Sequence, residues 1–509
     1  MNLVNLLEES ARKFSWRRCL ISETSSLSFR ALNGKANQLS FGLAKKLDLK
    51  KGQKVAVLLP NCLDFIVVLF AILKTGATCV PLNVFLTENE IKFILKDCAV
   101  RFLISSSEFQ GIYQNIGRDQ REELPDLENI ILTDKSQDGF LYLPQLVVKT
   151  EIKNSKLDIN QDDLAFLIYT SGTTGFPKGV MLSHSNLYAN VTASLEALKI
   201  KPNERMLLVL PMFHSFTLMV CILVPICAGA KIVIIKSVRP FQKVLRSILL
   251  NRITVIAGIP QLYDIFKNLN LPKLLQTLLR VRVCISGAAA LRLDTLEAFN
   301  QKFKRISLLE GYGLTEASPV VSLNPLQGVR KPGSIGLPLP GVETKVVRDD
   351  ESEAKVDEIG ELIVRGPNVM QGYYNLIEET RKVIRGGWLF TGDMAKIDRD
   401  KYIYIVGRKK EMIITHGMNV YPQEIENVLC LHPKIKEVAV VGKKDKAKGE
   451  VPVAFIVLKP DCLASEPEII DFCKGKLANY KIPRLIEFVP ELPKTPTGKI
   501  LKRKLVTSS

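Results

Sequence analysis

A chain of 509 residues exceeds the size of one typical hydrophobic core and predicts two or three domains. With 47% hydrophobic and 24% charged residues, its composition is that of an ordinary globular protein, which argues against extended disorder. The formal charge of +18 suits anionic partners such as nucleotides or a membrane surface, whereas the lack of zinc-finger, homeodomain or RNP-like motifs means that we expect no nucleic acid.

The N-terminal segment and the apolar runs bear on location. Segment 1–19 has no apolar core before a small-residue cleavage site, so it predicts an amphipathic helix rather than a signal peptide. The runs Phe65–Leu73 and Leu218–Ala230 are too short to span a bilayer and predict buried segments. Ten scattered cysteines and four histidines predict neither disulfides nor a zinc site. We therefore expect a cytoplasmic protein; peripheral contact with the inner face of the membrane and the oligomeric state stay open.

From Val55 to about Ile397, short apolar strands alternate with helical patterns. Strands separated by helices predict an α/β fold with mainly parallel sheets. The expected strands cover residues 55–60, 102–107, 164–170, 206–211, 231–236, 253–260 and 281–287.

The stretch YTSGTTGFPKGV, at Tyr169–Val180, directly follows one of these strands. Its glycines let the backbone approach a ligand closely, and its hydroxyls and N–H groups can line an anion-binding concavity. Lys178 adds a positive charge, and Pro177 stiffens the exit of the loop. No Walker A pattern fits. The stretch predicts a phosphate-binding loop, and the alternative is a solvated surface turn.

Five further stretches occur in order along the chain: LKTGATCVPLN (73–83), GYGLTE (311–316), GWLFTGD (387–393), GRKKEMIITHGMNVYPQEIE (407–426) and PKTPTGKI (493–500). Together with the loop they resemble the motifs of the adenylate-forming superfamily, which groups acyl-CoA synthetases, peptide-synthetase adenylation domains and luciferases. The resemblance implies a large N-terminal domain of stacked subdomains, residues 1–406. It also implies a small mobile α+β domain, residues 407–509, that carries the catalytic lysine.

The resemblance further implies the reaction. Joining a carboxylate to the α-phosphate of ATP brings two anionic groups together, so the site must neutralise charge. Lys499 matches the family's catalytic lysine, although Thr497 stands where serine is common. Glu316 matches the ligand of Mg²⁺, and Thr315 matches the hydrogen-bond partner of the α-phosphate.

The nucleotide site follows from the same resemblance. Asp393 would accept both ribose hydroxyls, assisted by Arg408, and Tyr312 would offer its ring to adenine. Gly313 would leave room beside the acyl pocket, and the turn SGAAAL would wall the adenine and acyl cavity, although such Ala-rich turns also occur where helices pack closely. The expected nucleotide-binding residues are Thr170, Ser171, Gly172, Thr173, Thr174, Gly175, Lys178, Gly287, Ala288, Ala289, Gly311, Tyr312, Gly313, Asp393 and Arg408.

Two more residues belong to the second half-reaction, in which coenzyme A accepts the acyl group. Lys410 occupies the position of the family's hinge, where a charged residue stays exposed while backbone dihedrals change. The resemblance implies that the small domain rotates there and presents Gly417 to the thiol tunnel, where a small residue lets the pantetheine arm pass.

The acyl substrate is indicated by PMFHSF, at Pro211–Phe216. Adenylation domains for amino acids place an aspartate there to hold the ammonium group, whereas this chain has His214, so a free amino acid is disfavoured. His214 either gates the acyl pocket or is a core residue. The following run, TLMVCILVPICAGA, suits the wall of an alkyl-binding pocket or a buried helix. Similarity to long-chain ligases favours a fatty acid over an aryl acid.

We therefore expect an AMP-forming acid–thiol ligase that uses ATP, Mg²⁺, a medium- or long-chain fatty acid and coenzyme A. The alternatives are an acyl carrier protein as acceptor, a cinnamate-like aryl substrate, a luciferase-like oxidase, and a basic scaffold without turnover. The presence of Lys499, Glu316 and Asp393 argues against the scaffold.

Overall fold

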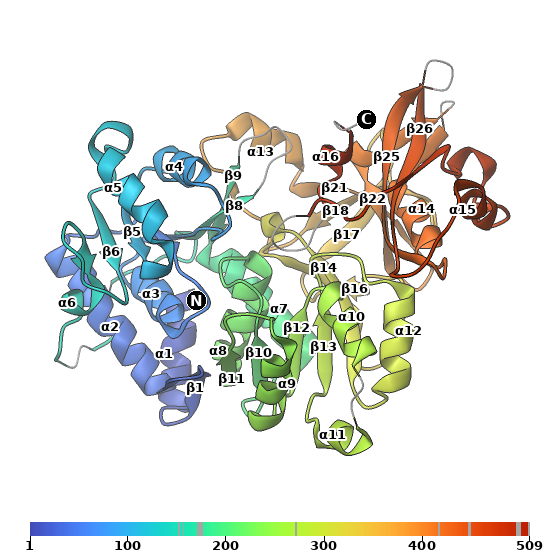
Figure 1. Ribbon diagram of the computed structural model, residues 1–509. Helices are drawn as coiled ribbons and strands as arrows, with labels where there is room; N and C mark the ends of the chain where they lie inside the picture. Colours follow the sequence, from blue (N-terminus) through green and yellow to red (C-terminus); the bar gives the residue numbers. More distant parts are fainter. Residues whose placement is uncertain are drawn as a thin grey trace.

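The computed structural model describes residues 1–150, 153–155, 157–170, 177–269, 272–415, 418–445, 449–494 and 500–506. Within these ranges the principal strands form four sheets, which we call the eight-stranded, the nine-stranded, the antiparallel and the C-terminal sheet. The eight-stranded sheet and its helices lie at the left in Figure 1, the nine-stranded sheet at the centre, and the C-terminal sheet at the upper right. The predicted α/β fold, with mainly parallel sheets and a small C-terminal domain, is confirmed.

The eight-stranded sheet is parallel from β8 to β7, and only β9 and β19 pair in antiparallel fashion at one edge. Strands such as β3 are buried on both faces, which is why they are continuous apolar runs in the sequence. In spatial order the strands are β19 (Gly372–Tyr373), β9 (Lys178–Ser183), β8 (Leu164–Thr170), β4 (Thr78–Pro81), β3 (Lys54–Leu58), β5 (Val100–Ser105), β6 (Asn129–Leu132) and β7 (Leu141–Tyr142).

The nine-stranded sheet is parallel from β14 to β1, and β16, β15 and β2 pair in antiparallel fashion at its two ends. In spatial order its strands are β16 (Leu337–Pro338), β15 (Val320–Leu323), β14 (Ser307–Gly313), β13 (Val283–Ser286), β12 (Val255–Gly258), β10 (Arg205–Leu208), β11 (Lys231–Ile234), β1 (Arg18–Ile21) and β2 (Ser26–Ser28).

One hydrophobic core fills the space between these two sheets, because its buried residues come from strands of both and from the helices between them. Both apolar runs lie there as predicted: Phe65–Leu73 within α3, and Leu218–Ala230 within a π-helical turn and α8. None of the described helices combines the length and apolar character needed to cross a membrane. The elements of this layer are α1 (Leu3–Lys13), α2 (Phe29–Lys46), α3 (Leu63–Lys74), α7 (His184–Leu198), η2 (Thr217–Leu223) and α8 (Val224–Ala228).

Other helices cover the outer faces of the two large sheets through two smaller core clusters. The eight-stranded sheet is covered by α4 (Glu88–Asp97) and α5 (Gln110–Glu123). The nine-stranded sheet is covered by α9 (Phe241–Leu250), α10 (Pro260–Asn268) and α12 (Leu293–Lys302), with the short α11 (Lys273–Leu278) nearby.

The antiparallel sheet follows, with strands β17 (Glu343–Val347), β18 (Gly360–Arg365), β21 (Trp388–Ile397), β20 (Ile384–Arg385) and β22 (Ile403–Arg408). The C-terminal sheet has cores of its own and contains β23 (Ile413–Thr415), β24 (Met418–Val420), β25 (Ile435–Asp445), β26 (Gly449–Leu458) and β27 (Leu485–Phe488). The helices of this half are α13 (Ile377–Val383), α14 (Pro422–Leu429), α15 (Glu466–Cys473) and α16 (Lys502–Val506). The domain boundary at 406/407 stays a prediction.

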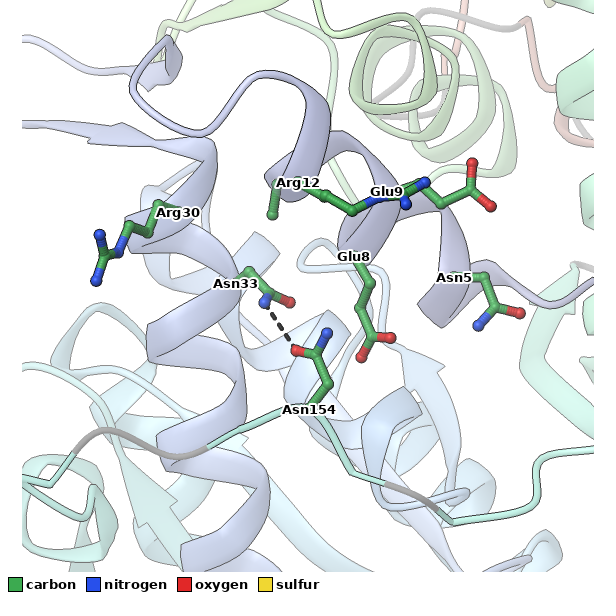
Figure 2. A pocket seen from close by; sticks show the side chains of 8 residues that line it. Asn5, Glu8, Glu9, Arg12, Arg30, Asn33 and Asn154 are labelled. Atoms are coloured by element: carbon green, nitrogen blue, oxygen red, sulfur yellow. Dashed lines mark hydrogen bonds between the residues drawn. The ribbon is translucent and has the colours of Figure 1, made fainter.

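A polar cavity of about 490 Å³ lies between α1, α2 and Asn154, and it contains none of the predicted site residues (Figure 2). Its side chains serve the packing of the N-terminal helices. Asn33 donates a hydrogen bond of 2.9 Å to Asn154, and Glu8 forms a 2.5 Å ion pair with the buried Lys74 of α3. The ion pair offsets part of the cost of burying the Lys74 ammonium group, whose pKa burial still lowers.

Two glycines of α2 give a matched test of this packing. A Cβ atom at Gly42 would lie 1.9 Å from the backbone oxygen of Leu146, in α6 (Leu143–Leu146), whereas a Cβ atom at Gly34 meets nothing within 4 Å. We expect Gly42→Ala to lower the free energy of unfolding by about 1–3 kcal/mol or more, because the backbone must move. Gly34→Ala should raise it by about 1 kcal/mol through helix propensity. Urea denaturation of both variants measures this, and equal effects would contradict the close approach of α2 and α6.

Candidate active site

The predicted phosphate loop is the connection of a β-hairpin. Strands β8 and β9 are antiparallel, and the last residue of β8, Thr170, pairs with the first residue of β9, Lys178. The hairpin therefore fixes where the loop leaves and re-enters the sheet. The loop residues Ser171, Gly172, Thr173, Thr174 and Gly175 lie outside the described residues, so their role stays a prediction.

Lys178 is connected to the predicted Mg²⁺ ligand through β19. Its Nζ forms a 2.5 Å ion pair with Oε2 of Glu379 and lies 5.2 Å from the ring centroid of Tyr373. Hydrogen bonds from Lys178 and Lys382 hold the pKa of the Glu379 carboxyl at about 2. The Tyr373 hydroxyl donates a 2.9 Å hydrogen bond to Oε1 of Glu316. The exit of the loop and Glu316 are thus held next to one another.

The predicted ribose residues form a compact cluster at the junction of two sheets. Asp393 in β21 is 3% exposed, and it pairs in register with Arg408 in β22. Nε of Arg408 lies 2.6 Å from Oδ1 of Asp393, and the Tyr312 hydroxyl donates to Oδ2. Burial, then the adjacent Asp393 charge, raises the pKa of the Tyr312 phenol well above its ordinary value. Burial alone would lower the pKa of Arg408, but interactions with Asp393, Tyr312, Glu411 and Glu316 together outweigh burial and raise it.

Two contacts connect the nucleotide and acyl parts of the predicted site. The hydroxyls of Ser215 and Thr315 lie 3.1 Å apart and share a hydrogen bond. A Cβ atom at Gly287 would meet the ring of Phe216 at 3.3 Å, so the ring packs directly over this glycine. The segment PMFHSF therefore lies between the ends of β13 and β14.

Two buried hydroxyls flank this contact. Thr217 follows Phe216, Ser286 precedes Gly287, and both residues are 0% exposed. Their hydroxyl oxygens have no hydrogen-bond partner among the described residues. An unsatisfied buried hydroxyl is costly, so a polar ligand group near the Phe216–Gly287 contact would gain from both.

His214 is half-buried and neutral at physiological pH, because burial lowers the pKa of its imidazole. Its Nδ1 accepts the backbone N–H of Phe216 at 3.2 Å, which leaves Nε2 as the protonated nitrogen. The side chain is therefore not a cation, and whether it gates the acyl pocket stays a prediction.

The turn after β13 and the start of GYGLTE are tied by a buried carboxyl. Oε1 of Glu310 accepts the backbone N–H of Leu291 at 2.8 Å, and burial raises the pKa of the Glu310 carboxyl to about 7. The contact holds the turn in which Ala288 and Ala289 are exposed and Ala288 has φ = +66°.

The glycines of GYGLTE have a packing reason for lacking side chains. A Cβ atom at Gly313 would lie 2.1 Å from the backbone oxygen of Pro319, and one at Gly311 would lie 3.1 Å from that of Ser322. The pairing of β14 with β15 thus requires small residues there, and their proposed roles beside the ligand stay predictions.

The predicted hinge residue Lys410 is exposed and lies in η4 (Lys409–Glu411), between β22 and β23. Its neighbour Lys409 is held by Glu361 and Asp349, each at 3.0 Å. Gly417 and Lys499 lie outside the described residues, so the thiol tunnel and the position of the catalytic lysine stay predictions.

Glu316 suits the role of Mg²⁺ ligand. Among the described residues, its Oε2 atom has no hydrogen-bond partner, and no group of three His, Cys, Asp or Glu side chains is gathered as a metal site. Mg²⁺ is usually held by one or two carboxylates together with phosphate oxygens, so a single protein carboxylate is sufficient.

The sequence interpretation did not single out Tyr373, Glu379, Ser215 or Glu310. Ser215 lies within the quoted stretch PMFHSF, and Glu310 directly precedes GYGLTE, so proximity to a motif was the signal available for both. Tyr373 and Glu379 lie about 200 residues beyond Lys178 and show no local pattern. The pairing of β19 with β9 brings Tyr373 to the site, and Glu379 lies in α13, which follows β19.

Comparison with known proteins identifies the family of the chain. Residues 7–374 match the family model described as AMP-binding enzyme, and residues 424–499 match its C-terminal domain. A long-chain-fatty-acid–CoA ligase of Escherichia coli O157:H7 is 34% identical, covering 99% of this chain and 94% of the relative.

Two solved structures align over 100% of this chain. The anthranilate CoA ligase AuaEII in complex with anthranoyl-AMP has a TM-score of 0.89 and 31% identity, covering 97% of that chain. ATP-bound MatB from Rhodopseudomonas palustris has a TM-score of 0.91 and 29% identity, covering 99% of that chain.

The chain belongs to the AMP-binding enzyme family. It is accordingly an AMP-forming acid–thiol ligase, and the cofactor prediction of ATP, Mg²⁺ and coenzyme A is confirmed.

The buried Glu310 predicts a pH dependence of stability. Its folded-state pKa of about 7 exceeds the ordinary 4.5, so the folded chain retains a proton that the unfolded chain releases. The free energy of unfolding contains this contribution in full below about pH 4.5. It falls by about 3 kcal/mol as the pH rises through about 7. We expect Glu310→Gln to remove that part of the decline in urea-denaturation curves between pH 4.5 and 8. The exposed Glu23→Gln is the control, and parallel pH profiles for wild type and Glu310→Gln would contradict the assignment.

Proposed function

We propose that this protein activates a medium- or long-chain fatty acid with ATP to give acyl-AMP and pyrophosphate, and then transfers the acyl group to coenzyme A in the cytoplasm. The observation that carries the proposal is the 3.1 Å contact of Ser215 with Thr315, which brings the predicted acyl segment against the predicted phosphate-binding residue. The relative named long-chain-fatty-acid–CoA ligase, which matches over nearly the whole chain, supports the choice of acid.

In the first step, the chain has to bring a carboxylate to the α-phosphate while neutralising the charge of both. Asp393 and Tyr312 would position the nucleoside, and Thr315 would donate to the α-phosphate. Bound Mg²⁺ would offset phosphate charge, with Glu316 as its protein ligand. Lys499 would then contact the carboxylate and the α-phosphate oxygen as negative charge grows between them.

The acyl side supports an uncharged, apolar substrate chain. Phe216 packs on Gly287, and the neutral His214 offers no negative charge to an ammonium group. The hydroxyls of Thr217 and Ser286, which have no hydrogen-bond partner among the described residues, could serve a polar group of the substrate. A free amino acid would bury its ammonium group without a partner, which is costly.

In the second step the small domain would turn about Lys410 and bring Gly417 to the thiol tunnel. The exposed position of Lys410 between two sheets supports this hinge. The closest rival acceptor is the phosphopantetheine arm of an acyl carrier protein. Incubation with labelled fatty acid, ATP and each thiol distinguishes the two acceptors.

The aryl alternative rests on the anthranilate ligase that aligns over the whole chain. A panel of acids from acetate to oleate, with benzoate and cinnamate, tests it by ATP–pyrophosphate exchange. We expect the highest kcat/KM for a medium or long fatty acid, because each additional buried CH₂ contributes about 0.8 kcal/mol. A preference for benzoate or cinnamate would replace the fatty acid as substrate, and no exchange with any acid would contradict the proposed function.

The role of Lys499 is tested by separating the half-reactions. We expect Lys499→Ala to reduce adenylate formation by about 10²-fold or more, because the transition state loses its mobile cation. Thioester formation from supplied acyl-AMP should remain within about tenfold of wild type, since that step would use the rotated conformation. Lys494→Ala, which removes a surface cation paired with Glu437, is the matched control. Equal loss in both steps would refute the assigned role.

A further inference from the structure

The parallel strands of the nine-stranded sheet all begin at one edge, which we call the amino edge. Strands β1, β11, β10, β12, β13 and β14 pair in parallel, so the residues that open them lie in a row. These opening segments, each consisting of the first strand residue and the five residues before it, contain a single acidic residue, Glu204. Their basic residues are Lys13, Arg17, Arg18, Lys201, Arg205, Lys231, Arg252, Arg280, Arg282, Lys302, Lys304 and Arg305.

Much of this positive charge is exposed and not neutralised. The single acidic residue, Glu204, is buried and pairs with Arg282 at 2.5 Å. Repulsion is evident at Lys231, where burial and then the neighbouring arginines of β10 and β1 lower the pKa of the ammonium group. Six further cations are exposed and form no ion pair among the described residues: Arg18, Lys201, Arg252, Arg280, Lys304 and Arg305.

Large apolar side chains project from the same segments. Trp16, Leu250 and Leu278 are 79%, 70% and 56% exposed. They precede β1, β12 and β13, and Figure 1 shows β1, α9 and α11 together at the lower end of the molecule. Exposed Trp and Leu side chains set among Lys and Arg are typical of surfaces that bind at the lipid headgroup boundary.

We propose that the amino edge docks on an anionic lipid bilayer. The basic row would lie against the headgroups, and Trp16, Leu250 and Leu278 would enter the boundary between headgroups and acyl chains. A nucleic acid would match the charge but leave these apolar side chains in water. An acidic carrier protein would bind far from its point of delivery, because Gly287 and Thr315 follow the opposite ends of β13 and β14.

The orientation has a direct consequence for the site. The carboxyl ends of the parallel strands face away from the amino edge, so docking would leave the ATP and coenzyme A side open to water. The large parallel sheet would stand between the lipid surface and the chemistry.

Co-sedimentation of the full chain with vesicles tests the proposal. We expect binding to phosphatidylcholine vesicles that contain phosphatidylglycerol, weak binding without it, and release at about 1 M salt, where the Debye length is about 3 Å. The triple variant Arg18→Glu, Arg252→Glu, Arg280→Glu should bind at least about tenfold more weakly, because each cation near the surface is worth about fivefold. The exposed triple Lys45→Glu, Arg118→Glu, Lys135→Glu makes the same change of net charge on the other large sheet and should keep binding within about twofold.

Fluorescence gives a second readout in a chain that folds normally. The sequence has only two tryptophans, so Trp388→Phe leaves Trp16 as the single reporter. We expect its emission to shift to shorter wavelength on anionic vesicles, because the ring leaves water. Equal binding of both triple variants, an unchanged Trp16 emission on vesicles that bind the protein, no binding to anionic vesicles, or displacement of the vesicles by duplex DNA would each overturn the proposal.

Discussion

The buried carboxylate of Asp393 is the charge around which the candidate site is assembled. An isolated buried carboxylate is costly, so Arg408 and Tyr312 have to stay in contact with it. The register of β21 with β22 supplies the arginine, and the end of β14 supplies the phenol. One electrostatic requirement thus holds the nine-stranded and antiparallel sheets together at the Asp393 cluster. Because Arg408 is the last residue of β22, the proposed movement of the C-terminal domain would begin beyond it, where Lys410 lies.

The polarity of the parallel sheet gives its two edges different chemistry. The strands are four to seven residues long, so the two edges lie roughly 13–23 Å apart. At the carboxyl ends lie small residues, hydroxyls and the Asp393 cluster, which suit a nucleotide and an acid. At the amino ends lie the exposed Trp16 and cations that form no ion pair within the described part of the chain. The charge of +18 is therefore not a uniform property of the surface, and its position is what selects a partner.

The sequence was sufficient to predict the strands and the buried helices, because an apolar run such as 164–170 by itself indicates a buried segment. Family motifs then pointed to Asp393, Arg408 and Tyr312, which the structure brings together, although their roles remain predictions. Tyr373 and Glu379 were not predicted, because only the edge strand β19 and the helix α13 that follows it bring them to Lys178. The amino edge was not predicted either, because its cations are scattered over about 300 residues and only the strand order aligns them.

The contact between Ser215 and Thr315 joins the predicted phosphate side of the candidate site to its predicted acyl side. Thr315 follows β14, and Ser215 precedes the π-helical turn η2, so each is fixed by a buried element. A 3.1 Å hydrogen bond between them leaves little freedom for the acyl segment to move against the phosphate side. The two neighbours of Ser215 carry no charge: His214 is neutral, and the ring of Phe216 packs on Gly287. Charge and apolar surface therefore meet along one short segment, which is the arrangement that a reaction between a triphosphate and an apolar acid requires.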